Sequence, residues 1–134
     1  MANKNKAKGT HAETKVVRLL QAAGIDADRM PLKGNMDEGD VWCIAHFDNG
    51  RPKKRKLILE VKAGKQTHYY RRKLKEEWLR QTKVQADNAG TDGYLVIASH
   101  NRNPRDYEVW SSCGTRFWYL DDFAASIALI NNTF

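Results

Sequence analysis

The chain has 134 residues, 41% of them hydrophobic, and its 23 Lys and Arg residues outnumber 16 Asp and Glu residues to give a formal net charge of +7. We expect one compact domain without a membrane anchor, because no apolar run approaches the roughly 20 residues that a spanning helix needs. Neither a secretory signal nor a CxxC pair is present, which favours the cytoplasm and buried thiols over export, a disulfide scaffold or a zinc site.

The first predicted elements are an arm and a helix. Residues 1–9 carry charge without an apolar anchor and are predicted to form a flexible basic arm before a single domain over residues 10–134. Apolar residues at helical spacing predict a helix over residues 10–23, with Thr10 as N-cap and Glu13 at the capping-box position.

Short strands and a hairpin are predicted next. A strand over residues 25–30 and a loop over residues 31–39 lead to a strand over residues 40–48. The tetrad Asp48-Asn49-Gly50-Arg51 is a turn signal. Residues 56–62 should therefore pair back on the preceding strand as a hairpin, with a basic run beside the turn.

The second half alternates helix and strand signals. A helix is predicted over residues 70–89, and its expected buried stripe comprises Leu74, Trp78, Gln81 and Gln85. The apolar run over residues 93–99 predicts a strand buried on both faces. Strands over residues 107–111 and 116–120 precede a C-terminal helix capped by Asp121. This order indicates an α/β domain with a mixed β-sheet flanked by helices.

The strand Leu57-Ile58-Leu59-Glu60-Val61-Lys62 contains the first chemical signal. Strand alternation sends Ile58, Glu60 and Lys62 to one face, so a carboxylate and an ammonium share it. For an isolated Glu-x-Lys pattern, a surface ion pair is the commoner explanation. Other residues of the chain must therefore decide between a surface ion pair and a functional site.

Asp40 lies at the start of the strand that should pair with the Glu60 strand. Adjacent strands are about 4.8 Å apart, so two carboxylates at matching height can bind one hard cation such as Mg²⁺. An acid at a strand start or turn is the ordinary alternative for Asp40.

Glu13 is predicted to lie on the same side of its helix as the core residues Val17 and Leu20. A buried carboxylate is costly unless a metal or a lysine pairs with it, and the capping-box role is an equally good explanation. Gln81 is likewise a polar residue on a predicted buried stripe, and a helix-edge amide is the alternative explanation.

Basic clusters predict contacts with the phosphate backbone of a nucleic acid, against the alternative of a solvated surface that ribosomal, chromatin and membrane-surface proteins share. The predicted DNA-binding residues are Lys4, Lys6, Lys8, Arg29, Lys33, Lys53, Lys54, Arg55, Lys56, Lys65, Arg71, Arg72 and Lys73. Tyr69 and Tyr70 are candidates either for stacking on bases or for packing. Because no base-reading helix is apparent, recognition of DNA shape is expected.

The motifs Lys8-Gly9-Thr10-x-x-Glu13, Gly39-Asp40-Val41 and Glu60-Val61-Lys62, followed by Gln81 and the buried strand, together resemble the archaeal-type Holliday junction resolvases of the PD-(D/E)XK nuclease superfamily. The chain departs from the pattern in three places. Gly39 replaces the usual proline before Asp40, the hairpin between Asp40 and Glu60 is longer and more basic than in compact members, and the helix after Leu120 is an addition. The resemblance implies a restriction-endonuclease-like fold and a homodimer that cuts four-way DNA junctions with Mg²⁺, for which Mn²⁺ is a substitute.

The resemblance also implies roles for individual residues. Asp40, Glu60 and the Val61 carbonyl would hold the metal, with Glu13 binding a second metal or a metal-bound water. Lys62 would act either as an electrostatic stabiliser or as a base, and Gln81 would brace the site. No small-molecule cofactor is implied.

Three alternatives share parts of this pattern. A repair nickase, a flap nuclease or a restriction-like enzyme would use the same catalytic residues on another DNA geometry. A non-catalytic DNA-binding module would explain the basic clusters but not the acids. An RNA-binding or tRNA-splicing protein is disfavoured, because no RNP-like aromatic motif is present.

Overall fold

The computed structural model describes residues 4–31, 39–48, 50–68, 72–100, 102–113 and 116–133, with side chains from residue 11 onward. Its elements are α1 (Lys4–Ala22), β1 (Ala27–Arg29), β2 (Val41–Asp48), β3 (Arg51–Ala63), the 3-10 turn η1 (Lys65–Thr67), α2 (Arg72–Ala89), β4 (Gly93–Ala98), the 3-10 turn η2 (Pro104–Asp106), β5 (Glu108–Ser111), β6 (Phe117–Tyr119) and α3 (Leu120–Thr133). Their order matches the predicted order. None of the described helices is long and apolar enough to span a membrane.

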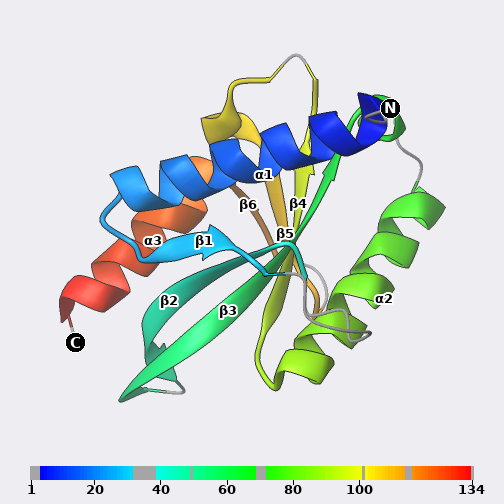
Figure 1. Cartoon of the computed structure of the whole chain (residues 1–134). Helices are drawn as coiled ribbons and strands as arrows, with labels where there is room; N and C mark the ends of the chain where they lie inside the picture. The colour runs from blue at the N-terminus through cyan, green and yellow to red at the C-terminus, as the bar shows by residue number, and fades with distance from the viewer. Residues whose placement is uncertain are drawn as a thin grey trace.

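The strands form one six-stranded sheet in the order β1-β2-β3-β4-β5-β6. The pair β3 and β4 is parallel, while the other four neighbouring pairs are antiparallel, so the sheet is mixed as predicted. The chain crosses from β3 to β4 through α2, as a parallel connection requires. Figure 1 shows α1 and α3 on the opposite side of the sheet from α2.

Two hydrophobic clusters hold these layers together. On one face, α1 and α3 pack against the sheet through a cluster that includes Val16, Leu59 and Phe123. On the other face, Trp78 of α2 covers Leu95 and Ile97 of β4. The prediction that β4 is buried on both faces is therefore confirmed, because its remaining residues face the first cluster.

The β2–β3 hairpin extends further than predicted. Its ladder reaches Asp48 opposite Arg51, and Gly50 has a φ of +82°, which suits a tight hairpin turn. The basic run Lys53–Lys56 therefore lies within β3 rather than beside the strand. The physical reason is that the two strands stay paired on both sides of a register shift between Ala45 and Phe47, which sequence alternation did not reveal.

Two predicted helix starts are wrong. Helix α1 begins at Lys4 rather than at Thr10, so most of the expected arm continues the helix. Gly9, a weak helix former, lies between these positions, and its cost of about 1 kcal/mol does not interrupt the helix. Helix α3 begins at Leu120, which places Asp121 inside the first turn, where a carboxylate favours the helix dipole.

The two cysteines differ. Cys43 in β2 is fully buried, as predicted, and burial raises the pKa of its thiol to about 12. Cys113 is exposed in the turn after β5, so the prediction that both thiols are buried is wrong for this one. A turn residue at the end of a short hairpin has no layer above it to cover the side chain.

Candidate active site

Asp40 is held against the edge of β3. The amide N–H of Asp40 donates to the carbonyl oxygen of Leu59 at 3.0 Å, and the amide N–H of Val61 donates to Oδ2 of Asp40 at 2.8 Å. Because Val41 pairs with Leu59 in the ladder, the next position places Asp40 level with Glu60. The predicted arrangement of two acids on neighbouring strands at one height is confirmed.

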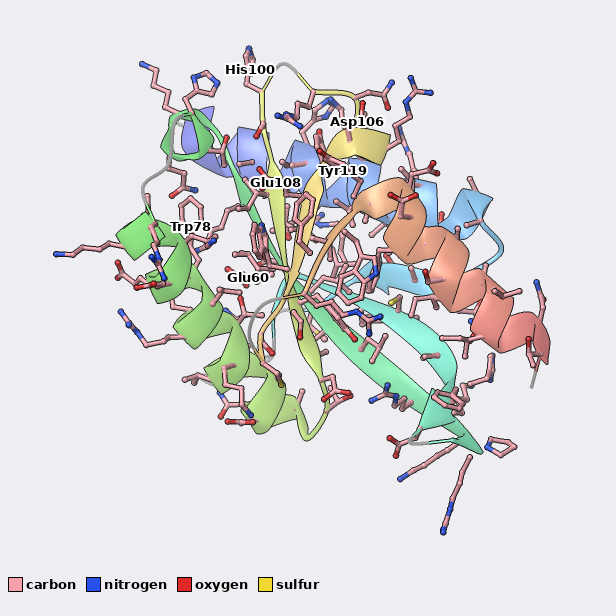
Figure 2. The ribbon with its side chains drawn as sticks, turned by 180° about the vertical axis from the view of Figure 1, so that it is seen from behind. Glu60, Trp78, His100, Asp106, Glu108 and Tyr119 are labelled. Atoms are coloured by element: carbon pink, nitrogen blue, oxygen red, sulfur yellow. The ribbon has the colours of Figure 1, made fainter. Side chains whose placement is uncertain are left out.

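Glu60 and Lys62 share the face of β3 that α2 covers. Leu57, Leu59 and Val61 point into the opposite cluster, as strand alternation predicts. Glu60 is only 8% exposed, and Lys62 Nζ lies 3.4 Å from Glu60 Oε1. In Figure 2 Glu60 lies on the same side of the sheet as Trp78 of α2. Glu60 and Lys62 therefore form a largely buried ion pair, and not the exposed surface ion pair that was the alternative explanation.

Glu13 projects from the middle of α1, away from any capping position. Its Oε1 lies 4.0 Å from Arg29 Nε, and its side chain is 16% exposed. The pKa of Glu13 is raised to about 7, mainly because burial removes water from the carboxylate and also because Asp40 repels it, while Arg29 acts in the opposite direction. The charge of Asp40 therefore affects the pKa of Glu13. The capping-box explanation is wrong, because the helix starts nine residues before Glu13.

We expect Glu13 to make stability fall as the pH rises. A carboxyl whose pKa is higher in the folded than in the unfolded state stabilises the fold fully below the unfolded value near 4.5, and this contribution is lost as the pH passes about 7. In the metal-free protein the loss should approach about 3 kcal/mol, and Glu13→Gln should remove it. Urea unfolding at pH values from about 4 to about 8 measures this loss of stability. An NMR titration of the Glu13 carboxyl carbon with a midpoint near 4.5 would contradict the prediction.

The carboxylates are a partial fit to a divalent cation. Within the described ranges, no three His, Cys, Asp or Glu side chains are close enough to hold a metal together, so Glu13, Asp40 and Glu60 do not form a closed set of ligands. Two strand carboxylates remain, which is the usual protein contribution to a Mg²⁺ site. The pKa of Glu13 is raised first by burial and second by repulsion from Asp40, and a bound cation would counteract that repulsion.

Gln81 does not lie on the buried stripe of α2. It is exposed, whereas Trp78, Thr82 and Gln85 are buried. Trp78 and Gln85 of the predicted stripe are buried, and only Gln81 is wrong, because the buried position is taken by Thr82. Thr82 gave no hydrophobic signal, and its hydroxyl donates a hydrogen bond to the Trp78 carbonyl at 2.8 Å. A bracing role for Gln81 at the metal site stays a prediction.

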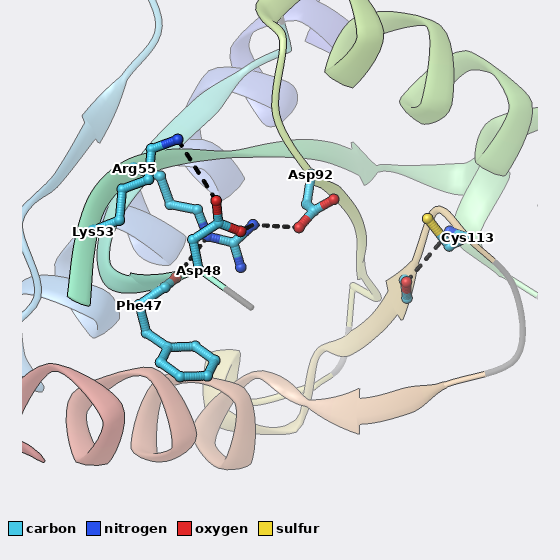
Figure 3. A network of polar contacts seen from close by, with 7 residues as sticks. Phe47, Asp48, Lys53, Arg55, Asp92 and Cys113 are labelled. Atoms are coloured by element: carbon cyan, nitrogen blue, oxygen red, sulfur yellow. Dashed lines mark hydrogen bonds and ion pairs between the residues drawn. The ribbon is translucent and has the colours of Figure 1, made fainter. Parts of the chain in front are cut away.

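Arg55 belongs to an ion-pair network and not to a free basic surface (Figure 3). Its Nε donates to the Phe47 carbonyl at 2.9 Å, and its Nη1 pairs with Asp92 and lies 3.8 Å from Asp48 Oδ1. Lys53 Nζ lies 3.7 Å from the other oxygen of Asp48. Arg55 therefore ties the hairpin to the turn before β4, and its contact with a phosphate stays a prediction.

The other predicted DNA-binding residues divide by environment. Arg29 faces Glu13, Arg72 pairs with Glu76 at 3.2 Å, and Lys56 Nζ lies 4.9 Å from the centroid of the Trp42 ring. The predicted lysines Lys53, Lys54, Lys56, Lys65 and Lys73 are all exposed. The predicted residues that fall outside the described part, or whose side chains do, are Lys4, Lys6, Lys8, Lys33, Arg71, Tyr69 and Tyr70.

Among the described residues, a mixed six-stranded sheet is flanked by three helices, and this is the restriction-endonuclease-like fold. The structure of Archaeoglobus fulgidus Hjc, a Holliday junction resolvase from an archaeal hyperthermophile, is similar with a TM-score of 0.53 and 17% identity, over 87% of this chain and 94% of that chain. No protein-family profile and no curated protein sequence matches the chain. The predicted fold class and the resemblance in fold are confirmed.

Proposed function

We propose that this protein is a structure-selective DNA endonuclease that hydrolyses phosphodiester bonds with Mg²⁺, and that its substrate is a four-way junction. The observation that carries the proposal is the placement of Asp40 level with Glu60, fixed by the Val61 amide, with Lys62 Nζ 3.4 Å from Glu60. A carboxylate pair beside a lysine suits phosphoryl transfer, in which negative charge builds up on the phosphorus oxygens.

Asp40, Glu60 and the Val61 carbonyl would hold Mg²⁺, or Mn²⁺ in its place. When bound, the ion supplies Lewis acidity and a water of lowered pKa. Asp40 is already oriented by the Val61 amide, so its carboxylate does not have to be ordered on binding. Lys62, whose ammonium neighbours Glu60, stabilises charge on the phosphate or accepts a proton from the attacking water. Glu13, whose pKa is raised to about 7, is only partly protonated at neutral pH and would lose the remaining proton when the cation binds.

The choice of a four-way junction rests on the likeness to Hjc, whose name describes a Holliday junction resolvase. A branched substrate with two-fold symmetry is matched by a two-fold symmetric enzyme, so the proposal includes a homodimer. The net charge of +7 supports a polyanionic partner.

The exposed Lys54 and its neighbour Arg55 make a matched pair for testing the DNA surface. Lys54→Ala should reduce the slope of log affinity against log salt by about 0.9, because one phosphate contact is lost. Arg55→Ala should instead lower the free energy of unfolding by about 1–3 kcal/mol, since Asp92 and the Phe47 carbonyl lose their partner. Filter-binding at several salt concentrations and urea unfolding distinguish them; equal effects of the two variants in both assays would contradict this assignment.

A cleavage assay tests the function directly. The full chain is incubated with Mg²⁺ and a four-way junction, a nicked duplex, a flap or a linear duplex of the same sequence, with Glu60→Ala as control. Paired symmetric cuts confined to the junction and lost in the variant are expected. Cuts in another substrate would assign a repair nickase, a flap nuclease or a restriction-like enzyme, and tight binding without cutting would assign a DNA-binding module.

A further inference from the structure

The turn end of the β2–β3 hairpin concentrates positive charge. Residues 44–56 contain five Lys and Arg residues and a single acid, Asp48. The exposed basic residues are Arg51, Lys53, Lys54 and Lys56. In Figure 1 this end of β2 and β3 extends away from α2 and from β4. A projecting basic surface of this kind suits the phosphate backbone of a nucleic acid.

A β-bulge brings two of these charges to one position of the hairpin. The register of the ladder shifts between Ala45 and Phe47, so that His46 lies opposite both Lys53 and Lys54. In a regular strand two adjacent side chains point to opposite faces, whereas a bulge redirects one of them and increases the local twist. The bulge therefore presents Lys53 and Lys54 together at one point on the ladder.

Two sets of contacts fix the hairpin to the rest of the domain. Arg55 pairs with Asp92 in the turn before β4 (Figure 3). On the other side Asn131 of α3 binds β2, because its Oδ1 accepts from the His46 amide at 2.8 Å and its Nδ2 donates to the Ile44 carbonyl at 3.0 Å. The longer hairpin and the C-terminal helix, both departures from the family pattern, are thus joined. A hairpin ordered before binding loses little conformational entropy when it binds.

The hairpin continues the strand that carries the candidate active site. Lys56 and Glu60 are four positions apart on β3, so strand alternation gives them the same face. Lys56 Nζ lies 4.9 Å from the centroid of the Trp42 ring on β2. From Lys54 to Glu60 the strand advances by roughly 20 Å at about 3.3 Å per residue. A DNA duplex that follows β3 from the site would reach the bulge after about six base pairs of about 3.4 Å each.

We propose that the bulge of the β2–β3 hairpin binds the phosphate backbone of a DNA duplex, through Lys53 and Lys54, about six base pairs from the phosphate at Glu60. B-form DNA turns once in about 10 base pairs, so a little over half a turn further along the duplex the opposite strand faces the protein. The hairpin therefore contacts the strand complementary to the one in the active site. The inference rests on the proposed function, because it takes DNA as the substrate.

The test is a scan in which one phosphate at a time is neutralised, as a methylphosphonate, along both strands of one duplex arm of a four-way junction. Filter-binding to the full chain, to Lys54→Ala and to Lys62→Ala is measured without metal, so that no DNA is cut. Removing Lys54 or its phosphate should each weaken binding about fivefold at low salt, and the two changes together should weaken it no further. The phosphate coupled to Lys54 should lie about six base pairs from the one coupled to Lys62, on the opposite strand.

Lys73→Ala is the matched control for Lys54→Ala. Lys73 is an exposed lysine of α2, so its loss changes the net charge equally without touching the hairpin. The effect of Lys73→Ala should simply add to that of neutralising the phosphate coupled to Lys54. A second variant, Asn131→Ala, leaves the charge unchanged and removes the contact between α3 and β2. It should weaken binding about threefold without changing the salt dependence, because the hairpin is then less well ordered before binding.

The position of the coupled phosphate decides the outcome. Coupling of Lys54 to a phosphate within about two base pairs of the one coupled to Lys62, or to no phosphate, would overturn the proposal. Equal affinity for a junction whose arm is single-stranded beyond about four base pairs would also overturn it. Binding with the expected spacing but without cleavage in Mg²⁺ would refute only the proposed reaction, and cleavage without this spacing would refute only this inference. Failure to bind any DNA would overturn both.

Discussion

Replacing Glu60 by Gln, or Asp40 by Asn, should reduce Mg²⁺-dependent cleavage of a four-way junction by on the order of 10³-fold or more. Each change removes one of two negative charges that the register of β2 and β3 brings to one height. Affinity for the junction should stay within about threefold or increase, because loss of an acid reduces repulsion of phosphates. Single-turnover cleavage and filter-binding of the same preparations measure the two quantities.

The matched control for these variants is Glu76→Gln. Glu76 is an exposed acid of α2 that pairs with Arg72 on the surface, so its loss changes the net charge equally without touching the site. Its cleavage rate should equal that of wild type. Retained cleavage by Glu60→Gln together with lost binding would show that the acid serves the fold or the DNA surface and not the reaction.

Gly39→Ala should inactivate the protein almost as strongly, by at least about a hundredfold, and should lower the free energy of unfolding by roughly 2–4 kcal/mol. Gly39 has a φ of +96°, and a Cβ at this position would lie 2.2 Å from Cγ2 of Ile58, which is fully buried. The clash is relieved by moving the backbone that carries Asp40, and the Val61 amide then loses its acceptor. This geometry also explains why proline, whose φ is near −65°, does not precede Asp40 in this chain.

Gly50→Ala provides the comparison, since Gly50 also has a positive φ, of +82°, but a Cβ there meets nothing within 4 Å. It should cost about 1–2 kcal/mol of stability from backbone strain and leave cleavage unchanged. Urea unfolding and single-turnover cleavage are compared for both variants. If the two glycine variants lose activity to the same extent, strain alone and not the displacement of Asp40 is responsible.

Elements with a strong local period were predictable. The alternation in β3 correctly placed Glu60 and Lys62 on one face and Leu57 and Leu59 on the other, because the direction of a strand side chain depends only on its position along the strand. The hairpin and the buried β4 followed from turn residues and an apolar run for the same local reason.

Helix faces with polar members were less predictable. Thr82 is fully buried while Gln81 is exposed, although neither residue type indicates this. Thr82 is tolerated in the interior because its hydroxyl binds the backbone of its own helix, and Gly93 of β4 lets α2 approach closely at that point. Both conditions depend on contacts between elements distant in the chain.

By itself, the sequence determined the order of elements, the mixed sheet and the chemical identity of the acidic pair with its lysine, since these depend on local periodicity and on composition. The tertiary structure alone decided which charges are available. Arg55 and Lys54 are neighbours in sequence, yet Arg55 is tied to Asp48 and Asp92 while Lys54 is exposed. Likewise the pKa of Glu13 near 7 arises from burial and from Asp40, 27 positions away in the chain. Ion pairing and desolvation depend on distances in space, and a linear pattern does not contain them.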